Sequence, residues 1–122
     1  MKFSKIRFSK EASDALDKMK GRVGLNWNVL CRIGFCLSLN DPVEVIPNAF
    51  KSDGSVDIDR KILIGNEDEL YIALLIQRCL ERGIQEDKHL DYFKAHMNRG
   101  ILLLSKRISN FKDLTQLVTS IS

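Results

Sequence analysis

Long apolar runs, cysteine and proline are all scarce in this chain of 122 residues. No apolar stretch reaches the roughly 18 residues that a membrane span needs, so no membrane segment is expected. The charges among the first ten residues exclude the apolar core of a secretory signal peptide. No segment repeats or has low complexity. With 44% apolar residues, residues 1–122 are expected to form a single domain in the cytoplasm.

The three cysteines are too few and too irregularly spaced for a disulfide framework or a C-x-x-C metal or redox site. Cys31 and Cys36 lie in an apolar segment, where a free thiol behaves as a small hydrophobic group, and Cys79 stands alone. We therefore expect buried structural thiols in a reducing compartment.

Sequence motifs of catalysis and nucleotide binding are missing as well. Gly21-Arg22-Val23-Gly24 is too short for a P-loop, lacks the following Lys-Ser/Thr, and comes after a predicted helix instead of a strand. No serine nucleophile motif, paired catalytic carboxylates or nucleophile with an evident base is present. We expect a protein that is not an enzyme and needs no cofactor.

Two groups of potential metal ligands fail on spacing. The acidic segment from Asp53 to Ile64 has isoleucine at its sixth and twelfth positions, where a calcium loop needs glycine and glutamate. His89 and His96 are seven residues apart, whereas zinc-binding histidines on one helix are usually four apart. We expect a solvated acidic turn, histidines that lie at the surface or are hydrogen-bonded, and no metal site.

The charged residues are distributed unevenly along the chain. Residues 1–40 contain eight Lys/Arg against three Asp/Glu, residues 41–91 contain six against twelve, and residues 92–122 contain five against one. This pattern is compatible with ordinary solvated charge, and equally with one face that attracts polyanions and another that repels them.

The N-terminal segment predicts a strand followed by a helix. Charged and apolar residues alternate from Phe3 to Phe8, as in a short strand or extended arm. Ser9 then occupies an N-cap position, and Gly21 is expected to end the helix in the left-handed conformation. The apolar residues between them follow helical spacing and are Ala12, Ala15, Leu16 and Met19.

A second helix is predicted from Trp27 to Leu39, capped by Asn26. It is apolar on nearly all sides, apart from Asn28, Arg32 and Ser38. A helix of this kind cannot face water in a small monomer. We expect one side to pack on the core and another side to pack on a second subunit.

The remainder predicts a loop and three more helices. Residues 42–64 are expected to be loop, with at most a small hairpin at Val56 and Ile58. Asn66 and Glu69 resemble a capping box for a helix over 67–82, with Leu70, Leu74 and Leu80 in the core.

Helices are also predicted over 87–107 and from 110 to the C-terminus. The first carries Leu90, Phe93, Met97 and Leu104 in one stripe, with Gly100 as a weak point. The second is capped by Asn110 and carries Phe111, Leu114, Leu117, Val118 and Ile121. The expected fold is mainly α: a short N-terminal strand or arm, then a bundle of about five helices.

The basic residues near the N-terminus are the best candidates for binding. Lysine and arginine side chains neutralise phosphates and release counterions, which gives salt-dependent and largely sequence-independent affinity for DNA. Few aromatic residues lie among them, so contacts to the backbone are favoured over stacking on unpaired bases. The predicted DNA-binding residues are Lys2, Lys5, Arg7, Lys10, Lys18, Lys20 and Arg22.

Two resemblances sharpen this interpretation. Strand, helix, turn and helix in the first forty residues resemble a ribbon-helix-helix unit. The segment NWNVLCRIGFCLSL, from Asn26 to Leu39, is similar to the signature of the DndE family of bacterial DNA sulfur-modification (phosphorothioation) proteins, and the similarity extends back to about Ile6.

The second resemblance implies a non-catalytic DNA-binding member of a cytoplasmic machine that replaces a non-bridging phosphate oxygen with sulfur. It implies partner proteins that deliver the sulfur: a cysteine desulfurase, an iron–sulfur protein and an ATPase-like protein. It also implies a homotetramer that binds double-stranded DNA, intact or nicked. The glycine turn is then expected to let subunits approach, through Gly21, Val23, Gly24, Leu25 and Trp27.

Three other functions stay open from the sequence. A sequence-specific ribbon-helix-helix regulator would read bases with Lys5 and Arg7, and would prefer its operator over random DNA by orders of magnitude. A scaffold that binds only protein would show no salt-sensitive DNA binding. An unrecognised enzyme is the third alternative.

Overall fold

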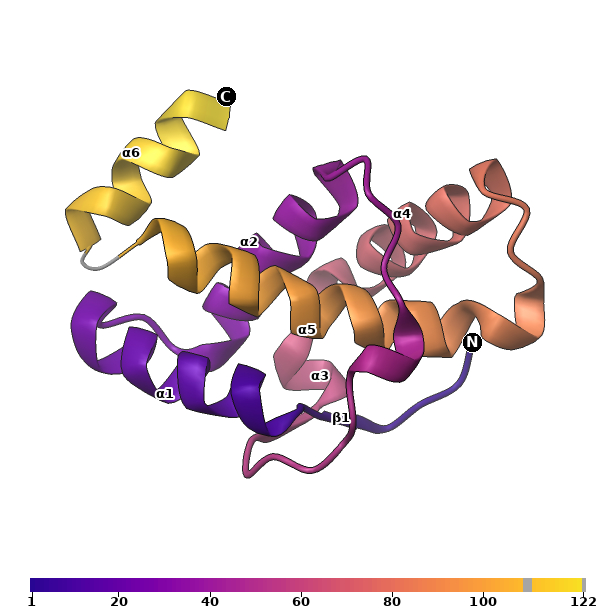
Figure 1. Ribbon diagram of the computed structural model, residues 1–122, viewed down its shortest axis with the longest axis horizontal. Helices are drawn as coiled ribbons and strands as arrows, with labels where there is room; N and C mark the ends of the chain where they lie inside the picture. Colours follow the sequence, from indigo (N-terminus) through magenta and orange to yellow (C-terminus); the bar gives the residue numbers. More distant parts are fainter. Residues whose placement is uncertain (109–110, 122) are drawn as a thin grey trace.

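The computed structural model describes residues 1–108 and 111–121, and these are mainly helical, as predicted. Figure 1 shows the helices and the two short strands. The elements are β1 (Lys5–Arg7), α1 (Lys10–Val23), α2 (Trp27–Asn40), β2 (Asp57–Asp59), α3 (Arg60–Leu63), α4 (Asp68–Glu81), α5 (His89–Arg107) and α6 (Phe111–Ile121). Three short 3₁₀ turns cover Pro47–Ala49, Gly65–Glu67 and Glu86–Lys88.

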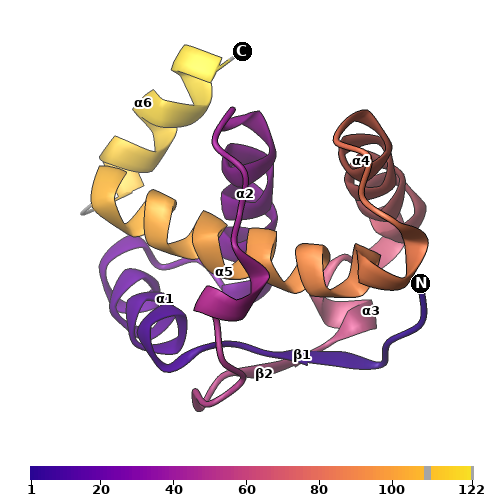
Figure 2. The same cartoon turned by 45° about the vertical axis from the view of Figure 1, so that its right-hand side comes forward.

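Helix α5 runs through the middle of the fold. In Figure 2, α6, α2 and α4 project to one side of α5, while α1 and the strands lie on the other. Helix α2 crosses α5 where Gly34 meets Gly100: a Cβ added to Gly34 would lie 2.7 Å from the Gly100 carbonyl carbon. Gly100 is therefore a site of close helix packing, and the expectation of a weak point was wrong.

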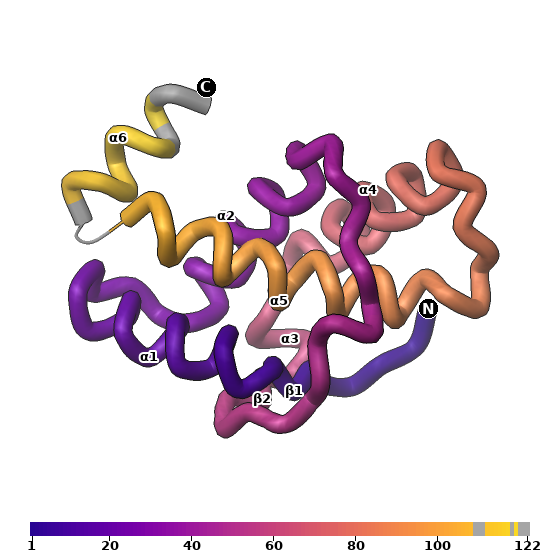
Figure 3. Tube along the Cα trace, in the orientation of Figure 1, coloured from indigo at the N-terminus to yellow at the C-terminus, as the bar shows by residue number. Residues whose placement is uncertain are grey.

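The two strands join segments that are far apart in the sequence. Antiparallel pairing sets Ile6 opposite Ile58, and Phe8 N–H donates to the Val56 carbonyl at 2.9 Å. Figure 3 shows the two segments side by side along one edge. The predicted strand is confirmed. Residues 42–64 were expected to be loop with at most a small hairpin, and this was wrong, because Asp57–Asp59 pairs with β1 and Arg60–Leu63 forms α3.

The first helix begins as predicted and ends later. The Ser9 side chain accepts a hydrogen bond from Ala12 N–H at 3.2 Å, which satisfies one of the free donors of the first turn. The helix continues through Gly21 to Val23, and Gly24 (φ 79°) adopts the left-handed cap. The assignment of the cap to Gly21 was wrong. The predicted apolar stripe is buried apart from Ala15, which is half-buried.

Helix α2 supplies the centre of the core. Phe35 is fully buried, and its ring centroid lies 5.2 Å from that of Phe93 on α5. Cys31 and Cys79 are buried, as expected, but Cys36 is exposed because it lies on the face of α2 that points away from α5. The buried thiol predicted at Cys36 was wrong.

Helix α4 differs most from its prediction. It starts at Asp68, after the 3₁₀ turn that contains Asn66, so the proposed capping box was wrong. The expected core leucines are largely exposed: Leu70 by 52%, Leu74 by 40% and Leu80 by 69%. The buried residues of α4 are Leu75, Arg78 and Cys79, which lie on the neighbouring face of the helix.

The C-terminal helices largely follow their predicted patterns. On α5, Phe93, Met97 and Leu104 are buried and Leu90 is half-buried. On α6, Leu114 is buried and Leu117 is half-buried. The predicted cap Asn110, and the side chains at 111, 118 and 121, lie outside the described residues. Among the described residues, no helix is both long and apolar enough to cross a membrane.

Candidate nucleic-acid interface

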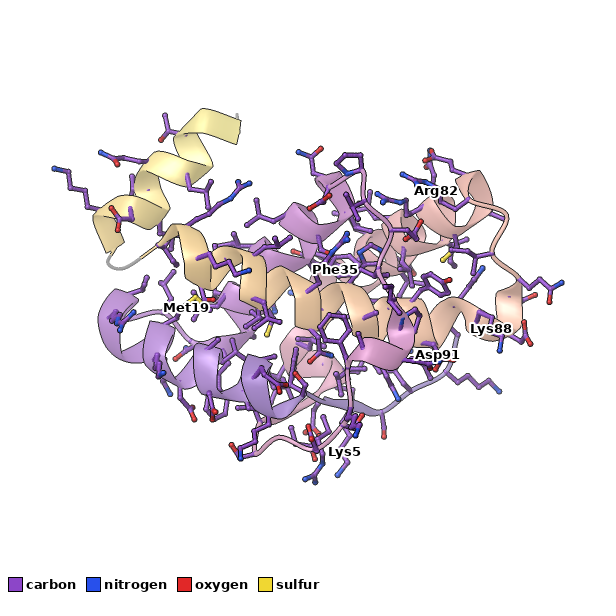
Figure 4. The ribbon with its side chains drawn as sticks, viewed as in Figure 1. Lys5, Met19, Phe35, Arg82, Lys88 and Asp91 are labelled. Carbon is purple, nitrogen blue, oxygen red and sulfur yellow. The ribbon has the colours of Figure 1, made fainter. Side chains whose placement is uncertain are left out.

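The predicted DNA-binding residues on β1 share one carboxylate. Lys5 Nζ lies 3.3 Å from Asp57 Oδ2, and an Arg7 guanidinium nitrogen lies 3.4 Å from the same oxygen. Figure 4 shows Lys5 extending outward from the strand. Cross-strand pairing produces this arrangement, because Arg7 stands directly opposite Asp57 in the sheet. Asp59 stands opposite Lys5 on the same strand as Asp57, so the sheet carries two cations and two carboxylates and offers an anion no net positive charge.

The other predicted DNA-binding residues are exposed, but they are not equivalent. Lys20 Nζ lies 5.1 Å from the centroid of the half-buried Trp27 ring, a cation–π contact across the turn between α1 and α2. Lys10 follows the Ser9 cap, and its backbone N–H donates to Asp53 at 2.9 Å. The remaining members of the set, all exposed, are Lys2, Lys18 and Arg22.

The predicted oligomer interface surrounds this same turn. Gly21 and Gly24 are exposed, and a Cβ added at either position would meet no atom of the chain within 4 Å. Gly24 needs its left-handed φ, whereas Gly21 lies within α1, where glycine costs about 0.5–1 kcal/mol relative to alanine. Val23 is buried in its own core, and Leu25 is half-buried. No contact within the described chain requires glycine at position 21.

A second cluster of cations, which the sequence did not reveal, stabilises the end of α2. Arg99 donates through Nε to Ser38 Oγ at 2.8 Å and through Nη2 to the Ser38 carbonyl at 2.6 Å. Arg78 donates to the carbonyls of Leu39 and Asp41. Since the last carbonyls of a helix lack partners within it, these guanidinium groups cap α2. Because the guanidinium groups of Arg78 and Arg99 are occupied by hydrogen bonds to α2 and the segment after it, we do not assign these arginines to a DNA-binding surface.

A buried histidine completes this cluster. His96 Nδ1 lies 2.8 Å from Ser38 Oγ, and its Nε2 lies 3.8 Å from Glu44 Oε1, beyond hydrogen-bond distance. Burial, together with the nearby positive charges of Arg99 and Arg78, lowers the pKa of His96 to about 3. The order Ser–His–Glu resembles a hydrolytic triad, but Ser38 and His96 are both completely buried. A substrate therefore has no access to either side chain.

An apolar hollow of about 490 Å³ lies between α2 and α4. Its lining residues are Arg32, Ile33, Cys36, Leu37, Asn40 and Tyr71. Arg32 is held in place by donating to the carbonyls of Leu63 and Ile62, at 2.8 and 3.0 Å. The sequence did not predict this hollow, because no motif marks a surface that forms between two helices far apart in the chain.

Comparison with known proteins identifies the family. A model of the family described as DNA sulphur modification protein DndE matches residues 5–112. The chain belongs to the DndE family. The resemblance found in the second helix is thus confirmed, and the match extends through α3, α4 and α5, where the sequence offered no motif. Most of α6 lies beyond the matched residues.

Solved DndE structures share the fold of this chain. DndE from Escherichia coli B7A, described as involved in DNA phosphorothioation modification, is 23% identical with a TM-score of 0.69. The match covers 85% of this chain and 98% of that one. A G21/24K mutant of DndE, described as involved in DNA phosphorothioation, is 21% identical with a TM-score of 0.68, covering 85% and 99%. No curated protein matches the chain.

Proposed function

We propose that this chain is a non-catalytic, DNA-binding component of the bacterial DNA phosphorothioation system, and that it acts in the cytoplasm as a homo-oligomer, most simply a tetramer. Membership of the DndE family supports the role in DNA sulfur modification. The observation that carries DNA binding is the set of exposed cations in the last turns of α1. Lys18, Lys20 and Arg22 have no carboxylate within 4 Å among the described residues.

The state of the thiols supports a non-catalytic role. Sulfur transfer through cysteine requires a thiolate, which burial disfavours. Burial raises the pKa of Cys79 to about 11, and it also raises the pKa values of Cys31 and Cys36 above the ordinary range. These shifts disfavour the thiolate form that sulfur transfer through cysteine would need. Delivery of sulfur would fall to partner proteins of the modification system.

Self-association is supported by the surface around the turn between α1 and α2. Gly21 lies at an exposed position of α1 where no described residue packs closely against it, and Leu25 and Trp27 are half-buried nearby. A second copy that approached the backbone here would explain the glycine and cover the apolar side chains. Joining several copies would also multiply one weak cationic surface into several, which raises affinity for a long polyanion.

The test is solution mass combined with DNA binding. We expect the purified chain to form an oligomer and to bind double-stranded DNA, intact or nicked, with affinity that falls steeply as salt rises. Competition with random DNA separates this function from that of a sequence-specific regulator, which would discriminate by orders of magnitude. A chain that stays monomeric and shows no binding to duplex DNA in dilute salt would contradict the proposal.

A further inference from the structure

We infer that the main phosphate-binding surface lies at one end of the molecule, where α1 and α5 end and α6 begins. This inference rests on the proposed DNA binding and assigns it to residues of the C-terminal region that the sequence did not single out. We call this surface the basic corner. Its residues are Lys18, Arg22, Lys106, Arg107 and Lys112, and all five are exposed.

The fold brings these residues together from three elements. Helix α1 packs along α5, and α6 contacts both of them. In Figures 1 and 2, the C-terminal ends of α1 and α5 and the start of α6 gather on the same side, at the end opposite α4. Ile108, directly after α5, and Leu114, on α6, are buried, which anchors this end to the core.

Helix geometry divides the cations of α1 between two flanks. Residues four apart share a flank of a helix, whereas residues two apart lie on opposite flanks. Lys18 and Arg22 therefore share one flank, and Lys20 lies on the other, where its ammonium contacts Trp27. Since Ser13, on the flank of Lys20, bonds Val56 beside β2, that flank faces the sheet. The flank of Lys18 and Arg22 is the one away from the sheet.

The corner keeps more of its charge than other cationic surfaces of the chain. The β1 cations share Asp57, Arg60 pairs with Asp68 at 2.6 Å, and Arg82 lies 3.6 Å from Glu44. In the parts of the chain that the structure describes, none of the five corner cations has a carboxylate within 4 Å.

Two features reduce the positive charge of the corner without cancelling it. Asp17 precedes Lys18, and Asp113 follows Lys112. The carbonyl ends of α1 and α5 also carry partial negative charge, which the basic residues of each last turn offset. Asp14, which is four residues before Lys18, shares its flank of α1, so five cations against three carboxylates still leave a net positive surface.

The chemistry of the partner follows from this arrangement. The corner has exposed ammonium and guanidinium groups spread over three elements, so it fits a repeating polyanion better than a single phosphate. Each phosphate that such a group neutralises contributes about 0.9 to the slope of log affinity against log salt concentration. The predicted contacts position DNA without reading its bases.

The test compares double variants that remove the same charge from different places. K106Q/R107Q and K18Q/R22Q remove two corner cations each, and K61Q/K88Q removes two exposed cations elsewhere as the matched control. Binding of a labelled duplex is measured by fluorescence anisotropy over a series of salt concentrations. Circular dichroism and light scattering confirm that each variant keeps its fold and its mass.

We expect each corner variant to reduce the slope of log affinity against log salt concentration by about 1 to 2. Near 0.1 M salt, binding should weaken roughly tenfold for each phosphate contact that is lost. The control should retain the slope of the parent chain. Corner variants that bind like the control would overturn the inference while leaving the proposed function standing. A parent chain that binds no duplex in dilute salt would overturn both.

Discussion

Gly34 and Gly100 lie backbone against backbone where α2 crosses α5, so that a Cβ on Gly100 would come within 2.1 Å of the Gly34 carbonyl oxygen. The obstacle is main chain, which cannot rotate away as a side chain can. This crossing holds the helix that carries the family-like segment against the central helix of the fold. It explains two glycines that sequence analysis left without a role.

Gly100→Ala should therefore destabilise the protein strongly. Forcing extra atoms into a tightly packed crossing costs about 1–3 kcal/mol or more, and here both helices must shift. Urea unfolding followed by circular dichroism measures the effect. Gly21→Ala is the matched control, since that helical glycine meets nothing within 4 Å, and alanine there should stabilise the monomer by about 0.5–1 kcal/mol. Equal stability of Gly100→Ala and the parent chain would refute the close crossing.

Neighbouring leucines on α4 should respond very differently to truncation. Leu75 is completely buried, whereas Leu74 is 40% exposed. Leu75→Ala removes core contacts and should cost about 2–5 kcal/mol in the free energy of unfolding. Leu74→Ala should lower the free energy of unfolding far less in the same urea titration, carried out at a protein concentration low enough to keep the chain monomeric. Similar losses of stability in the two variants would indicate that Leu74 is buried, as the sequence predicted, and would contradict the observed orientation of α4.

Stability should fall as the pH drops below the ordinary range of histidine. The pKa of His96 is about 3 in the folded chain, below the usual histidine value of 6.5, so between these pH values the unfolded state binds a proton that the folded state does not. The facing groups are Arg78, Arg99, Ser38 and, at 3.8 Å, Glu44. The stabilisation is complete above about pH 6.5 and is lost towards pH 3.

The slope of this loss should approach one proton, or about 1.4 kcal/mol per pH unit. Urea titrations between pH 7 and pH 4.5 measure it above the range where most carboxylates titrate. His96→Gln removes the titrating group and should flatten the dependence, although it lowers stability overall. An unchanged slope in His96→Gln would assign the effect to other groups.

Asp57→Asn should strengthen DNA binding. The carboxylate of Asp57 neutralises part of the charge of Lys5 and Arg7, and the amide leaves both cations free for phosphate. We expect a rise in affinity of roughly two- to fivefold in dilute salt, with a slightly steeper salt dependence. Asp87→Asn, which removes an exposed carboxylate just before α5, is the control for net charge. Weaker binding by Asp57→Asn would show that the pair itself organises the DNA contact.

Periodic patterns allowed much of the fold to be predicted. These patterns are local. The alternation around Ile6 and the apolar stripes of α1 and α5 indicate which side of each element is buried, and Ser9 marks the start of α1. The pairing of β1 with β2 could not be predicted, because it joins residues about fifty positions apart through a loop without a strong strand pattern. Gly21 and Gly24 are both plausible caps by sequence, and only the backbone shows which one turns left-handed.

The site was harder to predict than the fold. The sequence gives the sign of each charge but not its neighbours in space. From the sequence, Lys5 and Arg7 therefore appear as available for phosphate as Lys18, whereas in the fold both form ion pairs with Asp57. Leu70 and Leu74 were assigned to the core because α4 is apolar on two faces, and a pattern cannot tell which face the rest of the chain covers. The excess of basic residues after position 92 was visible in the sequence, but the fold was needed to join Lys106 to α1.

The most direct measurement of the central claim is the affinity of the full chain for a duplex as a function of salt concentration. If exposed lysine and arginine side chains hold the DNA backbone, log affinity will fall linearly with log salt, with a slope equivalent to several released counterions. Binding that is absent in dilute salt, or that does not change as salt rises, would contradict the account.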